Sequence, residues 1–145
     1  MKSKMIVGGD EKIYALIFDK TEEVIKGLTS FAKDHNLKAS HFTAIGAFKD
    51  AVLGYFDKDR KDYKRISVKE QVEVLVLTGD IAMKSDQPQV HAHVVLGRSD
   101  GSTRGGHLLE AHVWPTLEVI LHESPGYLKR VPDQETGLAL IDLSA

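Results

Sequence analysis

Three histidines near the middle of the sequence have the type and spacing that metal binding requires. His91 and His93 stand two residues apart in HAHVVLGRSDGSTRGGHL, and His107 follows His93 by fourteen residues, behind two glycines. On a strand, alternate side chains share one face, so His91 and His93 point the same way. Zinc binds neutral imidazole nitrogen, and three such ligands leave a fourth position open for water or substrate. The alternative is that these are ordinary polar residues of a glycine-rich hairpin.

The register of that hairpin decides whether His107 can join the other two histidines. Asp100-Gly101 is a two-residue turn signal, and with these residues at the turn centre Val94 faces His107. His107 would then share a face with Val94 instead of with the histidine pair. A bulge at Gly105-Gly106 would re-aim the side chain that follows, because glycine tolerates the backbone conformation of a bulge. We therefore predict a bulge or irregular turn at Gly105-Gly106.

The composition excludes several classes of function. The 145 residues, 42% of them hydrophobic, suit one globular domain spanning residues 1–145 with a sizeable core. The chain has 19 basic and 21 acidic residues and a net charge of -2, so it lacks the cationic surface that non-specific nucleic-acid binding requires. It has no cysteine, so any metal must bind to nitrogen and oxygen ligands.

The sequence shows neither a targeting signal nor a membrane span. MKSKMIVGGD carries two lysines but no apolar run of signal-peptide length, and no segment approaches the roughly 20 apolar residues that a membrane span needs. We therefore expect a cytoplasmic protein with no membrane partner.

The elements that must position the histidines are mostly strands. ASHFTAIGAFKDAVLGYFD at 39–57 gives two short strand patterns broken at Gly46, and the charge run DKDRKDYKR at 57–65 is typical of a solvated loop or hairpin tip. Apolar and β-branched runs predict further strands in KIYALIFD at 12–19, VEVLVLTGDIAM at 72–83, QPQVHAHVVLG at 87–97, LEVILHE at 117–123 and GLALIDL at 137–143.

One amphipathic helix is predicted between Thr21 and His35. Thr21 is the candidate N-cap, and Asn36 is a stop signal after the last turn. Apolar residues recur at helical spacing between them: Val24, Ile25, Leu28, Phe31 and Ala32.

A longer stretch of the sequence carries a family resemblance. HAHVVLGRSDGSTRGGHLLEAHVWPTLEVIL combines His-x-His, a Gly-Arg-x-Asp-Gly turn, Gly-Gly-His-Leu and Pro-Thr-x-Glu-Val. This combination resembles the plants-and-prokaryotes-conserved (PPC) domain, also called the domain of unknown function 296, in its free-standing bacterial and archaeal form. The resemblance extends in outline from KIYALIFD to the ending RVPDQETGLALIDL.

The resemblance implies an α+β fold with a mainly antiparallel sheet packed around one amphipathic helix, assembled as a homotrimer. It also implies that His91, His93 and His107 bind a metal, zinc or another divalent ion. The apolar strand at 72–83 supports the trimer, because a small sheet would need to cover such a strand on both faces. The DNA binding of the plant relatives, which usually lack these histidines and carry separate AT-hook segments, is not expected from this chain.

Two functions from different classes remain open. The first is a metal-binding trimeric protein with an interaction or regulatory role toward protein partners, as the plant domain's use in protein assembly suggests. The second is a small metalloenzyme acting on an oxo-acid, a hydroxy acid or an ester, by analogy with acetolactate decarboxylases of similar fold. We favour the first, because the sequence offers no convincing acid–base pair beside the open metal position.

The candidate catalytic residues are few, and each also suits an ordinary surface position. Glu118 lies in the Pro-Thr-x-Glu motif, Glu110 follows His107 by three residues, and Arg98 and Arg104 flank the hairpin turn, where a substrate carboxylate would be bound. If His107 is not the third ligand, the next candidates are His112 and Glu110. The four histidines outside the cluster are expected to be solvated or hydrogen-bonded: His35, His41, His112 and His122.

Overall fold

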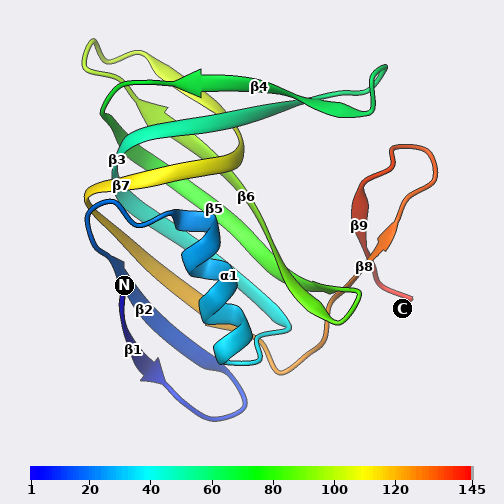
Figure 1. Ribbon diagram of the computed structural model, residues 1–145. Helices are drawn as coiled ribbons and strands as arrows, with labels where there is room; N and C mark the ends of the chain where they lie inside the picture. The colour runs from blue at the N-terminus through cyan, green and yellow to red at the C-terminus, as the bar shows by residue number, and fades with distance from the viewer. Residues whose placement is uncertain (145) are drawn as a thin grey trace.

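The computed structural model describes residues 1–144, which form nine strands and one short helix (Figure 1). The prediction of a mainly antiparallel sheet with one helix is confirmed. The elements in chain order are β1 (Lys2–Val7), β2 (Lys12–Phe18), α1 (Val24–Asp34), β3 (Ala39–Asp57), β4 (Asp62–Val68), β5 (Val72–Lys84), β6 (Gln87–Gly97), β7 (Thr103–Glu123), β8 (Lys129–Pro132) and β9 (Ala139–Asp142).

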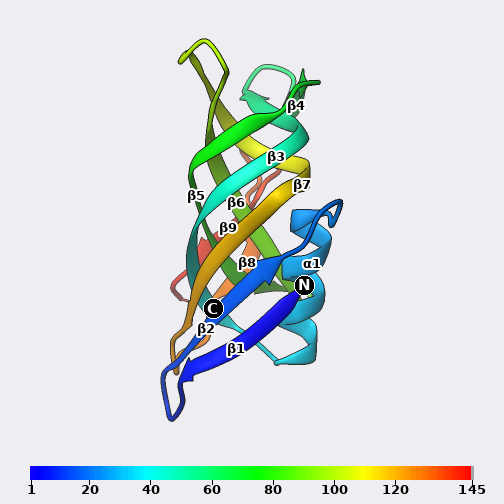
Figure 2. The ribbon, with the colours of Figure 1, turned by 90° about the vertical axis from the view of Figure 1, so that its left-hand side faces the viewer.

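Four long strands form the body of the sheet. β3 pairs with both β5 and β7, and β6 also pairs with both β5 and β7. These four strands therefore form a closed ring, as in a barrel. β2 continues the sheet from β7, and β1 follows β2 at the edge. The long strands are strongly twisted and wrap round a shared interior (Figure 2).

The sheet has one face toward the core and one face away from it. Leu77, Val94 and Leu121 point inward and are almost fully buried, together with the apolar side of α1. The alternate residues Ile120, Thr43, Thr78 and His93 follow one another across β7, β3, β5 and β6 and point away from the core. We call this second side the outer face.

The helix α1 begins later than the sequence pattern predicts. Thr21 has φ +70 and lies in a turn, where its N–H donates to the carbonyl of Val113, so it does not cap the helix. Glu23 is the N-cap instead, because its carboxylate accepts from the N–H groups of Ile25 and Lys26 at 3.1 and 2.7 Å. The helix ends at Asp34, with Asn36 at φ +53 just beyond it.

β3 is a single strand of 19 residues rather than the two short strands predicted. Gly46 marks an irregularity in its pairing with β5, but pairing resumes on both sides. A Cβ atom at Gly46 would lie 2.3 Å from the carbonyl oxygen of Thr116, and its φ is +153. The glycine therefore permits a close crossing of β7 and does not end the strand.

At the ends of the chain, β1 and β8 were not predicted from the sequence pattern, whereas β9 lies within the strand predicted at 137–143. β1 is exposed along its length and lies at the sheet edge. β8 and β9 form a short hairpin that stands to one side of the main sheet in Figure 1 and pairs with β5 only at Met83 and Lys129. The charge run at 57–65 is partly a turn, as predicted, but its second half belongs to β4.

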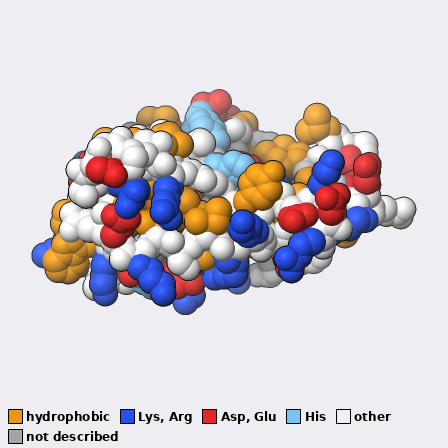
Figure 3. Space-filling model, turned by 90° about the horizontal axis from the view of Figure 1, so that it is seen from above, with side chains coloured by type: hydrophobic (Ala, Val, Ile, Leu, Met, Phe, Trp, Pro, Cys, Tyr) orange, Lys and Arg blue, Asp and Glu red, His pale blue; other side chains and the backbone are white. Residues whose placement is uncertain are grey.

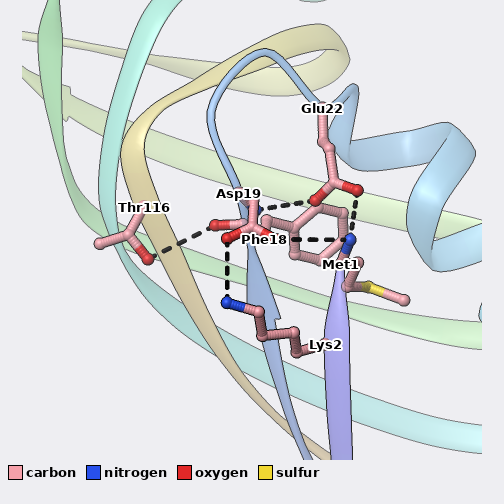
Figure 4. A network of polar contacts seen from close by, with 6 residues as sticks. All are labelled: Met1, Lys2, Phe18, Asp19, Glu22 and Thr116. Carbon is pink, nitrogen blue, oxygen red and sulfur yellow. Dashed lines mark hydrogen bonds and ion pairs between the residues drawn. The ribbon is translucent and has the colours of Figure 1, made fainter.

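A polar network connects β1 to the segment that precedes α1 (Figure 4). The amino group of Met1 contacts Glu22 and Asp19, and Lys2 lies 3.7 Å from the Asp19 carboxylate. Glu22 also accepts from the N–H of Asp19 at 2.7 Å. Among residues 1–144, no helix is both long enough and apolar enough to span a membrane.

Candidate metal centre

The three histidines at metal-ligand spacing come together on the outer face. His91 and His93 lie on β6, and His107 lies opposite His93 on β7. One ring nitrogen from each lies within 4.8 Å of the others. The ring centroid of His91 lies 5.1 Å from the centroid of His93 and 5.1 Å from that of His107. The centroids of His93 and His107 are 5.5 Å apart. We call these three residues the triad; Figure 3 shows histidine side chains gathered near the middle of one surface.

His107 reaches this position because of the hairpin turn and not because of a bulge at Gly105-Gly106. The pairing of β6 with β7 is regular from the turn to the pair His93 and His107. The extra residue lies in the turn, where the carbonyl of Arg98 accepts from the N–H of Gly101 at 2.9 Å and Gly101 has φ +81. The predicted site of the irregularity is therefore wrong, since Asp100-Gly101 belongs to a three-residue loop and not to a two-residue turn.

Gly106 is required by a close approach of β3. A Cβ atom there would lie 2.9 Å from the carbonyl oxygen of Gly54. Gly54 lies opposite His107, and a Cβ atom on Gly54 would lie 2.7 Å from the ring of Tyr63. Because Gly54 and Gly106 have no side chains, Tyr63 has room to stack on His107. The ring centroids are 4.6 Å apart, and the interplanar angle is 29°.

Asp80 of β5 connects the triad to the C-terminal hairpin. One carboxylate oxygen lies 3.6 Å from Nδ1 of His91, and the other pairs with Nη2 of Arg130 on β8. Arg130 is only 7% exposed, and its Nη1 donates to the carbonyl of Ala139 at 3.1 Å. A carboxylate on one ring nitrogen of a ligating histidine fixes the ring and leaves the other nitrogen for a metal.

The electrostatic environment favours neutral imidazoles at His93 and His107 and an ionised carboxylate at Asp80. Burial, and then repulsion from His91 and His93, lowers the pKa of His107 to about 4. Burial, followed by the charge of His91, also lowers the pKa of His93. Burial alone would raise the pKa of Asp80, but the nearby ring of His91 and the charge of Arg130 together hold it below its ordinary value. Neutral imidazole is the form that binds metal.

The triad has the donor chemistry of a metal site. Within the described part of the chain, Nδ1 of His107 is buried and has no hydrogen-bond partner. A buried polar atom without a partner costs roughly 1–3 kcal/mol, and an ion bound at that nitrogen would remove the cost. Three imidazole nitrogens without sulfur suit zinc and its neighbours in the first transition row.

A hollow of about 140 Å³ lies beside the triad. We call it the triad hollow. It is walled by β4, β6 and β7 on one side and by the C-terminal hairpin on the other, and its lining residues are Tyr63, Gln89 to His91, His107, Arg130 and Leu138 to Leu140.

The candidate catalytic residues do not line the triad hollow. Glu118 is exposed between Ile17 and Ile45, and Arg104 is exposed opposite Leu96 near the turn. Glu110 lies 4.0 Å from His112. Their catalytic roles stay predictions, as does the role of Arg98, whose side chain pairs at 2.8 Å with Glu70 in the connection between β4 and β5.

The other histidines have partners away from the triad. Nδ1 of His112 lies 2.7 Å from Asp50, and Nε2 of His122 lies 3.2 Å from Glu11. The rings of His41 and His122 are 5.0 Å apart, and the ring of His35 stacks on Phe31.

Four residues of the site were missed by the sequence analysis: Tyr63, Asp80, Gln89 and Arg130. Asp80 carried a usable signal, because it is a charged residue in the interior of a mostly apolar strand. Arg130 carried none, since its proximity to Asp80 depends on where the C-terminal hairpin folds back.

Comparison with known families gives one match over most of the chain. The family model of the Plants and Prokaryotes Conserved (PCC) domain matches residues 5–125. The C-terminal hairpin lies outside the matched residues.

Three solved structures resemble this one closely. A metal-containing protein from Archaeoglobus fulgidus is 35% identical, with 97% of this chain and 99% of that chain covered and a TM-score of 0.84. A PPC protein from Pyrococcus horikoshii is 33% identical, with 96% and 94% covered and a TM-score of 0.86. A protein from Bacteroides thetaiotaomicron, provisionally named a DNA-binding protein, is 27% identical, with 99% of both chains covered and a TM-score of 0.89.

The chain also matches part of a larger curated protein. It is 30% identical over 132 residues to the bifunctional protein GlmU of a Synechococcus species. The match covers 89% of this chain but 20% of that protein, so the chain spans about a fifth of its length.

Proposed function

The chain belongs to the Plants and Prokaryotes Conserved domain family, and from this membership and the triad we propose that it is a metal-binding, trimeric domain with an interaction or regulatory role. His91, His93 and His107 hold one divalent metal per chain, zinc being the best fit to the ligand set. The observation that carries the proposal is the convergence of three ligand nitrogens within 4.8 Å on one face. The metal-containing relative from Archaeoglobus fulgidus supports it.

The chemistry of the site explains why we favour binding over catalysis. A metal held by three imidazoles keeps an open position and acts as a Lewis acid there. An enzyme also needs a group that moves a proton near that position, and neither Glu110 nor Glu118 lines the triad hollow. The metalloenzyme alternative therefore lacks a named acid or base on this chain.

The role toward partners is argued from charge and surface. The net charge of -2 gives little counterion release on DNA, so any DNA binding by the chain alone is weak and lost as salt rises. Exposed apolar side chains on the outer face favour association with further protein, first of all with copies of the same chain.

Elemental analysis of purified protein tests the metal site. The wild type should carry about one metal per chain, and His107→Ala should lose most of it, because two imidazoles hold zinc far more weakly than three. The fold should survive in His107→Ala, since the buried strands and not the ion form the core. Circular dichroism checks the fold of each protein before the metal is counted.

His41→Ala is the matched control for this experiment. His41 is also a histidine of the sheet, but its ring neighbours His122 and not the triad. It should keep the full metal content. A His107→Ala protein with undiminished metal would show that the third ligand lies elsewhere and would overturn the proposed site.

A further inference from the structure

The three buried polar side-chain atoms that lack a hydrogen-bond partner, within residues 1–144, belong to residues of one hollow. They are Nδ1 of His107, Nε of Arg130 and Oε1 of Gln89, and all three residues line the triad hollow. Such atoms are rare in folded proteins, and each calls for a bound ion, water or ligand. A metal on the triad accounts for His107, but it leaves Arg130 and Gln89 without partners.

We propose that the triad hollow is a binding site for a small carboxylate that carries an adjacent hydroxyl group, held between the metal, Arg130 and Gln89. This inference rests on the proposed metal function and goes beyond it by naming the ligand class. Nε of Arg130 donates to one carboxylate oxygen, and Oε1 of Gln89 accepts from the hydroxyl. A metal held by the triad would supply the remaining contact to the ligand.

The charges at the site favour an anion. Asp80 already neutralises one positive charge through its pair with Arg130. With neutral imidazoles, a divalent metal adds two further positive charges that no side chain lining the hollow balances. Arg130 is nine-tenths buried, so its hydrogen bond to an anion forms away from bulk water and is correspondingly strong.

The volume limits the size of the ligand. The hollow holds about 140 Å³, well below the roughly 300–1,000 Å³ of pockets for drug-sized ligands, so it suits a small molecule. Leu138 and Leu140 of the C-terminal hairpin form an apolar wall that offers no partner to a second charged group. Glycolate and acetate both fit this limit and differ only by the hydroxyl group.

Part of the wall that recognises the ligand lies beyond the residues that the family model matches, although the related solved structures extend over it. Arg130, Leu138 and Leu140 all follow residue 125, where the match to the family model ends. The hairpin is connected to the triad through Arg130, Asp80 and His91. The ligand preference of the site is therefore set by the C-terminal hairpin and the metal together.

Calorimetric titration of the zinc-loaded protein with glycolate and with acetate tests the proposal. Glycolate should bind saturably and about tenfold more tightly than acetate, because only glycolate satisfies Gln89. Gln89→Met keeps the length of the side chain but removes its polar atoms, so it should bring glycolate down to the level of acetate. Arg130→Lys keeps the charge but lacks Nε, and it should weaken both ligands about tenfold.

Gln71→Met is the matched control, because Gln71 is exposed and lines a different part of the surface. It should bind glycolate like the wild type. Metal content, measured on every variant, must stay at the wild-type level for these comparisons. Absence of saturable glycolate binding to zinc-loaded protein, as expected for a hollow filled by water alone, would overturn the proposal, and so would equal binding by Gln89→Met.

The metal proposal fails separately from the ligand proposal. If the wild type takes up no zinc, the metal function is wrong, and glycolate is then titrated into the metal-free protein. Binding that is lost in Gln89→Met would support the carboxylate site without a metal. If the metal-free wild type does not bind glycolate, the carboxylate site is wrong as well.

Discussion

Asp80 contacts both His91 of the triad and Arg130 of the C-terminal hairpin. It would act on a metal only through His91. Its carboxylate lies 3.6 Å from Nδ1 of His91, where it orients the ring and leaves the other nitrogen for a metal. The same carboxylate pairs with Arg130 and so connects the hairpin to the sheet. Asp80 is therefore a positioning residue.

Asp80→Asn should lower zinc affinity by about 10- to 100-fold while the triad remains in place. The amide keeps the shape of the side chain but removes the charge that orients His91. Competition with a chelator of known zinc affinity gives the change. Asp50→Asn is the control, because Asp50 makes a similar pair with His112 at 2.7 Å away from the triad. Equal zinc affinity of Asp80→Asn and wild type would refute the positioning role.

Gly106 affects both stability and metal binding through the space it leaves. Gly106→Val should cost about 1–3 kcal/mol of unfolding free energy, because its Cβ would lie 2.9 Å from the Gly54 carbonyl and β3 would have to move. Since Gly54 lies opposite His107, the shift should also reduce metal content. Denaturant unfolding and elemental analysis measure the two effects. Gly126→Val, where an added Cβ meets nothing within 4 Å, should change neither.

At the scale of single elements, the helix start shows why capping is hard to predict from sequence. Thr21 has the residue type of an N-cap, but the chain turns there with φ +70, and the helix begins at Val24. Glu23 takes over because its longer side chain reaches two helical N–H groups and also accepts from Ala111 N of β7 at 3.3 Å. The contact with β7 could not be seen in the local sequence.

Glu23→Ala should destabilise the protein by about 1–2 kcal/mol, since it removes a cap and leaves N–H groups of α1 without partners. Thr21→Ala should cost much less. Thermal unfolding of the two variants against wild type separates the two possible caps. A larger loss in Thr21→Ala would mean that the helix begins where the sequence pattern placed it.

The strands that carry the triad were largely predictable, while their register and partners were not. The alternation in QPQVHAHVVLG gave β6 and the shared face of His91 and His93, because a period of two is a local property. The position of His107 depended on one residue in the turn, where Gly101 takes the left-handed conformation. The local signals for a two-residue and a three-residue loop overlap at Asp100-Gly101. The sequence therefore placed His107 beside His91 and His93 correctly, but through a bulge at Gly105-Gly106 that does not exist.

Contacts between distant segments were the part that sequence could not give. The apolar run at 72–83 was predicted as a buried strand, but β5 alternates and leaves Leu75 51% exposed. Tyr63 and Arg130 reach the triad hollow from strands that are far from β6 in the sequence. Nothing in their own neighbourhoods indicates this, because the approach depends on the glycines at 54 and 106 and on the return of the C-terminal hairpin.

At the scale of the whole molecule, the chain exposes more surface than a compact monomer should. Its accessible surface is 8399 Å², whereas a monomer of 16.0 kDa is expected to expose about 7,400 Å². Part of the surplus is apolar and lies on the outer face: Ile45 is 60% exposed, Ile120 47% and Val95 37%. A stable interface buries about 800 Å² on each partner, so the surplus is of the size that association would cover.

These surfaces lead to the prediction that the chain forms a homotrimer. The apolar outer face supports association, and the threefold symmetry is an expectation from the family resemblance. Light scattering at micromolar concentration should give a mass three times the 16.0 kDa of the chain.

Ile45→Asp should shift the mass toward that of the monomer, because a buried carboxylate without a partner costs several kcal/mol at each interface. Leu143→Asp should not, since Leu143 is 89% exposed beyond β9, the last strand of the chain. A wild-type mass equal to one chain would contradict the trimer, and a trimer that survives Ile45→Asp would show that the interface lies on another part of the surface.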